Sequence, residues 1–420
     1  MQTTVGALFL FLILERFIGM GATTAALVIL ACSACAQSKL RIPRGALAAL
    51  IIPATLIALG LLGAMGHDLR DVIKDMWYFS FPALAVFTGY LLAARCKRVE
   101  PVLFAFVAAG AILSCWQIIE FITHRGLLQS GSFNDVRNEI GSGYELSALA
   151  PLILILASRT AVKVLPVRTK VLPFAIYSVT LIAVILAFSR TITLSLLVSL
   201  IAGLGWLTAK RKRGLIIIGI IVGVLLGLST VVPEDAGSFL GKLAHSRDEV
   251  SFGDFSTTTD AIRYWRAYET LRALQTYADG TVMQKATGLG FGQLVDIGFY
   301  VDLGGTVMRE IPIFHNGYVY VLLKTGYIGL ILLLVYSARF YILGARSFES
   351  PIPRKRLLAG LTMAVTSTIA ISTFVISGWF NPTEMCSTLV MLGMLAGFLS
   401  EGAEKKTSRG AKSSQVAAAA

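Results

Sequence analysis

The stretch "GALAALIIPATLIALGLLGAMG", residues 45–66, decides the fold class. Thr55 carries the only polar side chain in it. A helix needs about 20 mostly apolar residues to cross a hydrocarbon core of roughly 30 Å, and this run has that length. A strand of a membrane barrel would alternate apolar and polar residues instead. The stretch therefore predicts a membrane-spanning α-helix.

Similar runs recur from end to end of the chain. The hydrophobic fraction of 55% and the mean hydropathy of +0.74 lie far above those of soluble domains. We expect an all-α polytopic membrane protein with about 12 transmembrane helices. Glu15 and Arg16 interrupt the apolar run between the first two spans, which are two helices or one long tilted helix. The expected spans are 4–20, 21–37, 45–65, 76–94, 100–123, 144–159, 172–188, 190–208, 214–231, 326–345, 357–378 and 384–400.

The formal net charge of +13 follows from this topology. With the N-terminus inside, every cationic cluster between spans falls on the inner side, as the positive-inside rule requires. The clearest cluster is "KRKR" at 210–213. The basic excess indicates orientation and contact with anionic membrane lipids. We therefore expect no nucleic-acid partner.

Four regions follow from the spans. Residues 1–231 hold helices 1 to 9, and residues 232–325 form one large outer loop with a re-entry segment. Residues 326–400 hold helices 10 to 12, and residues 401–420 read as a disordered cytoplasmic tail. Acidic residues outnumber basic ones in the large loop, so the loop is not a general basic patch. The position of each arginine in it therefore has to be explained separately.

One part of the large loop predicts an amphipathic helix. It reads "TTTDAIRYWRAYETLRALQTYA", residues 257–278, and Thr258 or Thr259 suits the N-cap. The aromatic stripe suits a helix at the membrane interface or one packed on the rest of the loop. Arg263 and Arg266 project away from that stripe. They face either a cavity or solvent.

Arg190 and His315 stand out for their positions. Arg190 lies in a very short outer turn between two apolar helices, where an arginine is costly unless it pairs, lines a wet cavity or snorkels to headgroups. His315 and Asn316 lie where the large loop re-enters the membrane. An imidazole there exchanges protons near neutral pH, whereas the alternative is an interfacial or capping polar residue.

Together these residues suggest one chemistry. Arginine binds phosphate as a planar fork, and histidine acts as a base. A substrate with a lipid tail and a diphosphate head would need both groups at this depth. The chain shows neither a metal-ligand spacing nor a phosphate-binding loop, so we expect no metal and no cofactor. Cys32 and Cys35 lie in an apolar stretch without histidines, which favours packing over a metal or redox role.

Three motifs, in this order, resemble the O-antigen ligase and O-antigen polymerase superfamily. They are "FSRT" at 188–191, "RYW…TGLGFG" at 263–292 and "FHNGYVYVLLKTGYIGLILLL" at 314–334. The resemblance covers about 180–345, and elsewhere it is one of topology. It implies an inverting, metal-independent glycosyltransferase of the GT-C type in the bacterial inner membrane, with an active site facing the periplasm. The donor would be an undecaprenyl-diphosphate-linked glycan, and the acceptor a glycan or lipid A–core.

The resemblance also implies roles for individual residues. His315 would be the catalytic histidine that helps to deprotonate the acceptor hydroxyl. Arg190 and Arg263 would hold the leaving diphosphate, with Arg266 as the substitute loop arginine. Asn316 and Tyr318, next to His315 in the motif, would contact the substrate.

Lys324 departs from the family pattern, which has an acidic or other polar residue before the Thr-Gly pair. This departure bears on the acceptor and not on the class of enzyme. Ligation of a finished glycan and polymerisation of repeat units share the donor chemistry, and we lean slightly to a polymerase. The alternatives are a lipid-linked glycan flippase or other multi-pass transporter, and a membrane scaffold.

Overall fold

The computed structural model describes residues 2–36, 42–96, 98–124, 126, 144–166, 171–187, 189–208, 216, 219, 255, 257–302 and 305–400. Among them, 5 helices are long and apolar enough to cross a membrane. They are α3 (Arg44–Leu62), α4 (Leu69–Arg95), α5 (Glu100–Thr123), α16 (Gly317–Ser347) and α17 (Pro353–Ile376). Each coincides with an expected apolar run, which indicates a multi-pass membrane protein.

Shorter helices match most of the remaining expected spans. They are α1 (Gln2–Leu14), α2 (Met20–Ala36), α8 (Glu145–Arg159), α9 (Val171–Leu186), α10 (Arg190–Gly203) and a last helix, Cys386–Ser400. The first two spans are separate helices, because a turn containing Glu15 and Arg16 divides them. The expected span 214–231 and the tail 401–420 lie outside the described residues, apart from Ile216 and Gly219.

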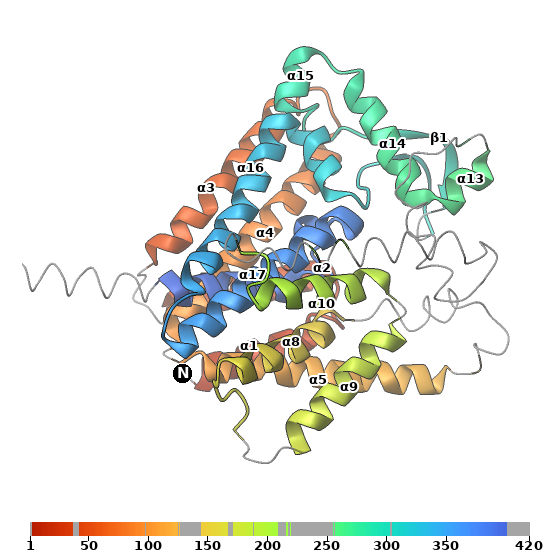
Figure 1. The fold of residues 1–420 in the computed structure, drawn as a ribbon. Helices are drawn as coiled ribbons and strands as arrows, with labels where there is room; N and C mark the ends of the chain where they lie inside the picture. Colours follow the sequence, from red (N-terminus) through yellow and green to blue (C-terminus); the bar gives the residue numbers. More distant parts are fainter. Residues whose placement is uncertain are drawn as a thin grey trace, which may run out of the picture.

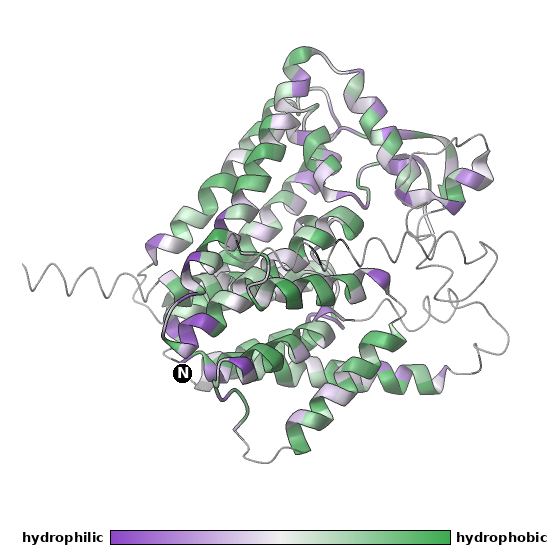
Figure 2. Ribbon diagram, viewed as in Figure 1, coloured by the Kyte–Doolittle hydropathy of each residue, from purple (hydrophilic) through white to green (hydrophobic). Residues whose placement is uncertain are grey.

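The part of the large loop that the structure describes forms a small cap at one end of the helix bundle (Figure 1). It consists of α13 (Thr258–Arg263), α14 (Trp265–Ala278), α15 (Val282–Thr287), β1 (Val295–Asp302) and β2 (Val307–Ile311). The two strands pair antiparallel, with Val295 opposite Ile311. Hydrophilic residues gather in this cap, while the bundle helices are mostly apolar (Figure 2).

The loop helix differs from the expected one in two details. Its N-cap is Thr257, whose Oγ1 accepts a hydrogen bond from the Asp260 N–H at 3.2 Å, so the helix starts one residue earlier than expected. Non-helical backbone at Tyr264 then divides it into α13 and α14. The Tyr268 hydroxyl donates to the Ile297 carbonyl at 2.6 Å, so the aromatic side of α14 packs on β1.

The glycine-rich turn Gly288–Gly292 docks the cap onto the bundle. The Leu289 N–H donates to the Leu323 carbonyl on α16 at 2.8 Å. Gly290 has a φ of +95°, and a Cβ added there would lie 2.1 Å from the Gly63 carbonyl carbon at the end of α3. Only glycine permits both this backbone conformation and this approach. The turn thus has the structural role that its three glycines indicate.

A buried ion pair lies beneath the same turn. One Asp75 oxygen accepts hydrogen bonds from the Lys324 ammonium at 2.6 Å and from the Gly292 N–H at 2.7 Å. The other accepts from the Tyr320 hydroxyl at 2.5 Å. The side chains of Lys324 and Asp75 are 0% and 1% exposed. Lys324, the residue that departs from the family pattern, therefore links α16 to α4 and to the glycine turn.

Helix α16 begins at Gly317, earlier than the expected span 326–345. The stretch 317–325, expected as a re-entry segment, is the first part of this helix. Gly326 interrupts it with a φ of +69°. The cap end of α16 therefore carries the residues that follow His315 into the bundle.

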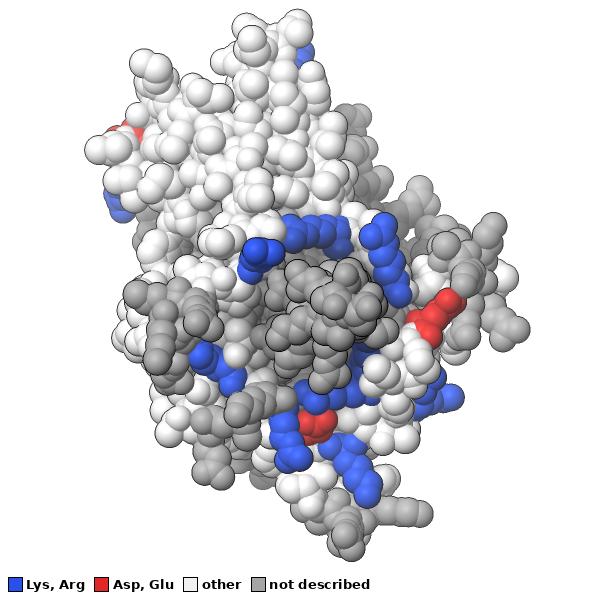
Figure 3. Space-filling model, turned by 90° about the vertical axis from the view of Figure 1, so that its left-hand side faces the viewer, with Lys and Arg blue, Asp and Glu red and all other residues white. Residues whose placement is uncertain are grey.

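Basic residues gather at the end of the bundle opposite the cap. Arg44 opens α3, Arg95 ends α4 and Arg346 lies in the last turn of α16. Figure 3 shows Lys and Arg side chains around this face, with few Asp or Glu among them. This is the distribution that the positive-inside rule gives for cytoplasmic helix ends.

Candidate active site

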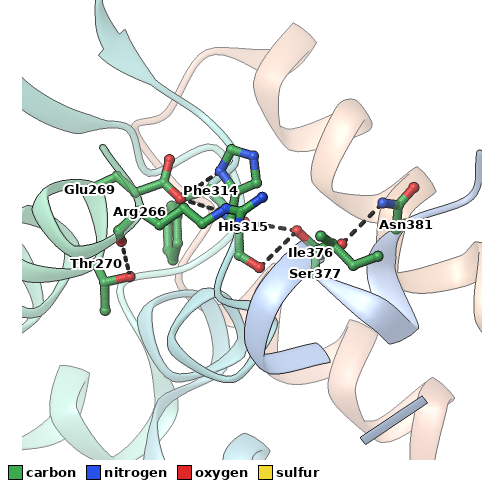
Figure 4. Close-up of polar contacts among 8 residues, drawn as sticks. All are labelled: Arg266, Glu269, Thr270, Phe314, His315, Ile376, Ser377 and Asn381. Carbon is green, nitrogen blue, oxygen red and sulfur yellow. Dashed lines mark hydrogen bonds and ion pairs between the residues drawn. The ribbon is translucent and has the colours of Figure 1, made fainter. Parts of the chain in front are cut away.

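A polar cavity of about 320 Å³ opens between the cap and the bundle. Segments far apart in sequence form it: α4, the starts of α8 and α10, α14, the segment before α16, and the turn after α17. Figure 4 shows the contacts along one wall. The residues that line the cavity are Tyr78, Glu145, Ser189, Thr191, Ile192, Arg266, Ile313, Phe314, His315, Ile376, Ser377, Phe380, Asn381, Pro382, Thr383 and Glu384.

His315 is held by the carboxylate of Glu269. One Glu269 oxygen contacts the backbone N–H of His315 at 2.6 Å and its Nδ1 at 2.8 Å. The Glu269 side chain is 2% exposed and that of His315 is 43% exposed. A carboxylate only accepts hydrogen bonds, so Nδ1 donates to it and the neutral ring presents an unprotonated Nε2. In this tautomer Nε2 can accept a hydrogen bond from another group.

Arg266 lies on the same helix as Glu269, one turn earlier. Side chains three residues apart share a helix face, and Arg266 lines the cavity that His315 also lines. Figure 4 shows the Arg266 side chain extending from α14 toward His315. One face of α14 therefore supplies both a cation for the cavity and the carboxylate that orients the imidazole.

The turn after α17 braces the backbone of His315. Ser377, at a φ of +64°, donates from its N–H to the His315 carbonyl at 2.5 Å and from its hydroxyl to the Phe314 carbonyl at 2.9 Å. The Asn381 amide donates to the Ile376 carbonyl at 3.0 Å and closes the turn. The position of the imidazole is thus fixed from two sides, by α14 and by this turn.

Arg190 is the first residue of α10. Ser189 caps the helix by accepting a hydrogen bond from the Ile192 N–H at 3.4 Å. Ser189, Thr191 and Ile192 all line the cavity, while half-buried Arg190 lies directly between them in sequence. The start of α10 thus borders the cavity, although Arg190 itself is not among the described residues that line it.

Arg263, which the family resemblance implies as the loop arginine, lies outside the cavity. It ends α13, and its guanidinium lies over the Tyr264 ring at 5.5 Å from the centroid. Its side chain is exposed and is not among the described residues that line the cavity. Non-helical backbone at Tyr264 separates α13 from α14, and of the two loop arginines Arg266 is the one that lines the cavity with His315.

Asn316 and Tyr318 make structural contacts. The Asn316 side chain accepts hydrogen bonds from the Tyr318 and Val319 N–H groups, both at 3.2 Å, and so caps α16. The Tyr318 hydroxyl donates to the Ala370 carbonyl on α17 at 3.0 Å. Of the His-Asn pair, the histidine faces the cavity and the asparagine starts the helix. Neither Asn316 nor Tyr318 is among the described cavity-lining residues.

Several cavity residues were not singled out from the sequence. Glu269 has one signal, its spacing of three residues from Arg266 on a predicted helix. Glu145 ends the polar stretch "RNEIGSGYE" at 137–145, which can equally be an ordinary solvated loop. Tyr78 has no signal, because it lies near the outer end of an ordinary apolar helix. Asn381 and Glu384 fall in the short connection between the last two spans, which reads as a plain turn.

Comparison with known proteins adds one finding. A family model described as O-antigen ligase matches residues 175–334. The match runs from α9 into α16 and contains Arg190, Arg266, Glu269 and His315. It confirms the resemblance drawn from the three motifs. No curated protein matches the chain.

Proposed function

Because residues 175–334 carry the O-antigen ligase domain, we propose that this membrane protein transfers an undecaprenyl-diphosphate-linked glycan to an acceptor sugar. The acceptor is lipid A–core in a ligase and a further lipid-linked glycan in a polymerase. The reaction takes place at the periplasmic face of the bacterial inner membrane. The single observation that carries this proposal is the shared cavity of Arg266 and the His315–Glu269 pair.

The orientation follows from the charge distribution. Basic residues gather at the bundle end opposite the cap (Figure 3), and such ends face the cytoplasm. The cap and the cavity then lie on the periplasmic side. A donor whose lipid tail stays in the bilayer would present its diphosphate and first sugar at this depth.

In this proposal the diphosphate lies between the loop arginine and the start of α10. Arg266 lines the cavity there, and Arg190 is the first residue of α10, whose start borders the cavity. The N-terminus of α10 adds partial positive charge from its backbone N–H groups. Fixed positive groups stabilise the charge that grows on the leaving diphosphate more than they stabilise the bound donor. The arginines thus supply the cationic role without requiring a metal ion.

His315 would act on the acceptor. Its Nε2 takes the proton of an acceptor hydroxyl as the oxygen attacks the anomeric carbon of the donor sugar. The bond between that carbon and the phosphate oxygen breaks, and its electron pair leaves with the lipid diphosphate. Glu269 stabilises the imidazolium that forms, as a buried carboxylate does in a hydrolase triad. A single displacement of this kind inverts the anomeric configuration.

The function is tested with the purified protein in lipid vesicles. The donor is undecaprenyl-diphosphate-linked glycan, and lipid A–core and lipid-linked glycan are offered as acceptors. The proposal expects a product whose mass equals the acceptor plus the donor glycan, with release of undecaprenyl diphosphate. Movement of the donor across the bilayer without any new glycosidic bond would favour a flippase and overturn the proposal.

The same assay distinguishes a ligase from a polymerase by the acceptor that is used. Deletion of the gene makes the same distinction in cells. Single-repeat chains on lipid A after deletion indicate a polymerase. Full-length chains that remain on the lipid carrier indicate a ligase. Both outcomes are read from the surface glycan on a gel.

A further inference from the structure

The cavity has a second wall that carries carboxyl groups in place of cations. Glu145 and Glu384 line it together with Asn381 and Tyr78. These residues come from the start of α8, the turn after α17 and α4. The arginines and the imidazole belong to α10, α14 and the segment before α16. The two walls therefore have separate structural origins as well as different polar groups.

Glu145 is the most informative residue of this wall. It is 8% exposed and borders the cavity. Within the described part of the chain, no other residue donates a hydrogen bond to its carboxylate. Burying a carboxyl group is unfavourable unless its oxygens find hydrogen-bond partners, and the nearby Arg16 guanidinium and the start of α8 offset only part of this cost. A buried acceptor group that faces an open cavity indicates a ligand that donates hydrogen bonds.

The carboxyl groups of this wall make it a poor site for the diphosphate of the donor. Glu145 and Glu384 give a diphosphate no positive group to bind, whereas Arg266 and the start of α10 do. Sugar hydroxyls donate and accept hydrogen bonds, so they can pair with a carboxyl group in either of its protonation states. Tyr78 and Phe380 add aromatic surface to the same wall, which suits the apolar face of a sugar ring.

We propose that Glu145 and Glu384, with Asn381 and Tyr78, form the subsite that binds the acceptor sugar. This inference rests on the proposed glycan transfer. The acceptor hydroxyls pair with the two carboxyl groups, and this orients one hydroxyl toward Nε2 of His315. The donor diphosphate occupies the arginine side of the same cavity.

The turn after α17 supports this arrangement. It carries Asn381 and Glu384, and through Ser377 it also holds the His315 backbone. The Asn381 side chain accepts from the Glu384 N–H at 3.2 Å and so fixes the position of Glu384. One rigid turn therefore sets the distance between the acceptor wall and the proposed base.

The test separates acceptor binding from donor binding. Wild-type protein, Glu145→Gln and Glu384→Gln are reconstituted in vesicles, and initial rates are measured while one substrate is varied at saturating concentration of the other. The donor is undecaprenyl-diphosphate-linked glycan, and the acceptor is whichever of lipid A–core and lipid-linked glycan the wild type uses. Loss of a hydrogen bond to the carboxyl group predicts a rise of about tenfold or more in the acceptor KM. The donor KM is expected to stay within about twofold.

Glu100→Gln is the matched control, because Glu100 lies at the basic end of the bundle beside Arg354, 3.7 Å away. It should leave both KM values unchanged. If Glu145→Gln does not accumulate in the membrane, half-exposed Glu384 carries the test. An unchanged acceptor KM in a folded variant, or a rise in the donor KM alone, would overturn the inference and leave the proposed function standing. Absence of transfer by the wild type to either acceptor would overturn both.

Discussion

The carboxylate of Glu269 holds His315 through two contacts, to its backbone N–H at 2.6 Å and to its Nδ1 at 2.8 Å. The two residues are 46 positions apart in sequence. One comes from α14 in the cap and the other from the segment that leads into α16. The imidazole is therefore oriented before any substrate arrives, with Nε2 left for the cavity.

Replacing Glu269 tests whether this orientation matters for the reaction. Glu269→Gln keeps the size of the side chain but removes the charge that stabilises an imidazolium. We expect kcat to fall about a hundredfold, within the range for general acid–base catalysis, while both KM values stay within about twofold. Glu269→Asp should recover part of the loss. Equal losses in the Gln and Asp variants would instead indicate a packing role for Glu269.

The arginines can be distinguished by a matched series. Arg266→Gln and Arg190→Gln should each lower kcat by about a hundredfold, as expected when one group that stabilises transition-state charge is removed. Arg263→Gln should stay within about twofold of wild type, because its guanidinium lies over the Tyr264 ring outside the cavity. Glycan transfer in vesicles gives all three rates. A large loss in Arg263→Gln with little loss in Arg266→Gln would reverse the assignment of the loop arginine.

The buried pair of Asp75 and Lys324 should control stability rather than chemistry. Lys324→Met leaves Asp75 buried without its countercharge, and breaking such a pair costs about 3–5 kcal/mol. The double variant Asp75→Asn/Lys324→Met should lose less than the single one. Thermal unfolding of the purified proteins in detergent measures the difference. A single variant as stable as wild type would contradict the role of this pair in docking the cap.

The hairpin of the cap should respond to acid. Arg309, which forms an ion pair with Asp296 at 2.9 Å, lowers the pKa of the Asp296 carboxyl below its usual value. A carboxyl whose pKa is lowered by folding contributes stability above its unfolded pKa of about 3.9. That contribution is lost as the pH falls through the folded pKa. The protection of β1 and β2 against hydrogen exchange, measured relative to the intrinsic exchange rate at each pH, should therefore fall below about pH 4.

Asp296→Asn is the control for this acid response. It lacks the titrating group, so its hairpin should exchange faster than wild type near neutral pH and change less on acidification. Because both side chains are about half exposed, solvent and salt weaken the effect. A wild-type hairpin whose exchange protection is the same on both sides of pH 4 would contradict this prediction.

The helical framework could be predicted from the sequence because apolar runs leave few alternatives. The expected span 100–123 and the helix Glu100–Thr123 share both ends. Boundaries were less certain where the amphipathic loop helix begins and where α16 enters the bundle. At each place a local backbone feature sets the boundary. The N-cap residue Thr257 starts the loop helix, and the kink at Gly326 divides α16. Neither is visible in the periodicity of apolar residues.

The site was only partly predictable for a different reason. The sequence singles out His315 and Arg190 because polar groups are conspicuous beside apolar runs, and of the two only His315 is among the described residues that line the cavity. The choice between Arg263 and Arg266 depends on the break at Tyr264, which separates one helix segment from the next. Pairs such as Asp75 and Lys324, 249 positions apart, form only when the chain folds. Periodicity along the chain carries no information about such contacts.

The central claim is that His315 takes the proton of the acceptor hydroxyl. The most direct measurement is glycan transfer by His315→Ala in vesicles, beside His124→Ala, an exposed histidine at the end of α5. Both variants should accumulate in the membrane like wild type. Transfer should be near the wild-type rate for His124→Ala and undetectable for His315→Ala. Transfer by folded His315→Ala within a few-fold of wild type would contradict it.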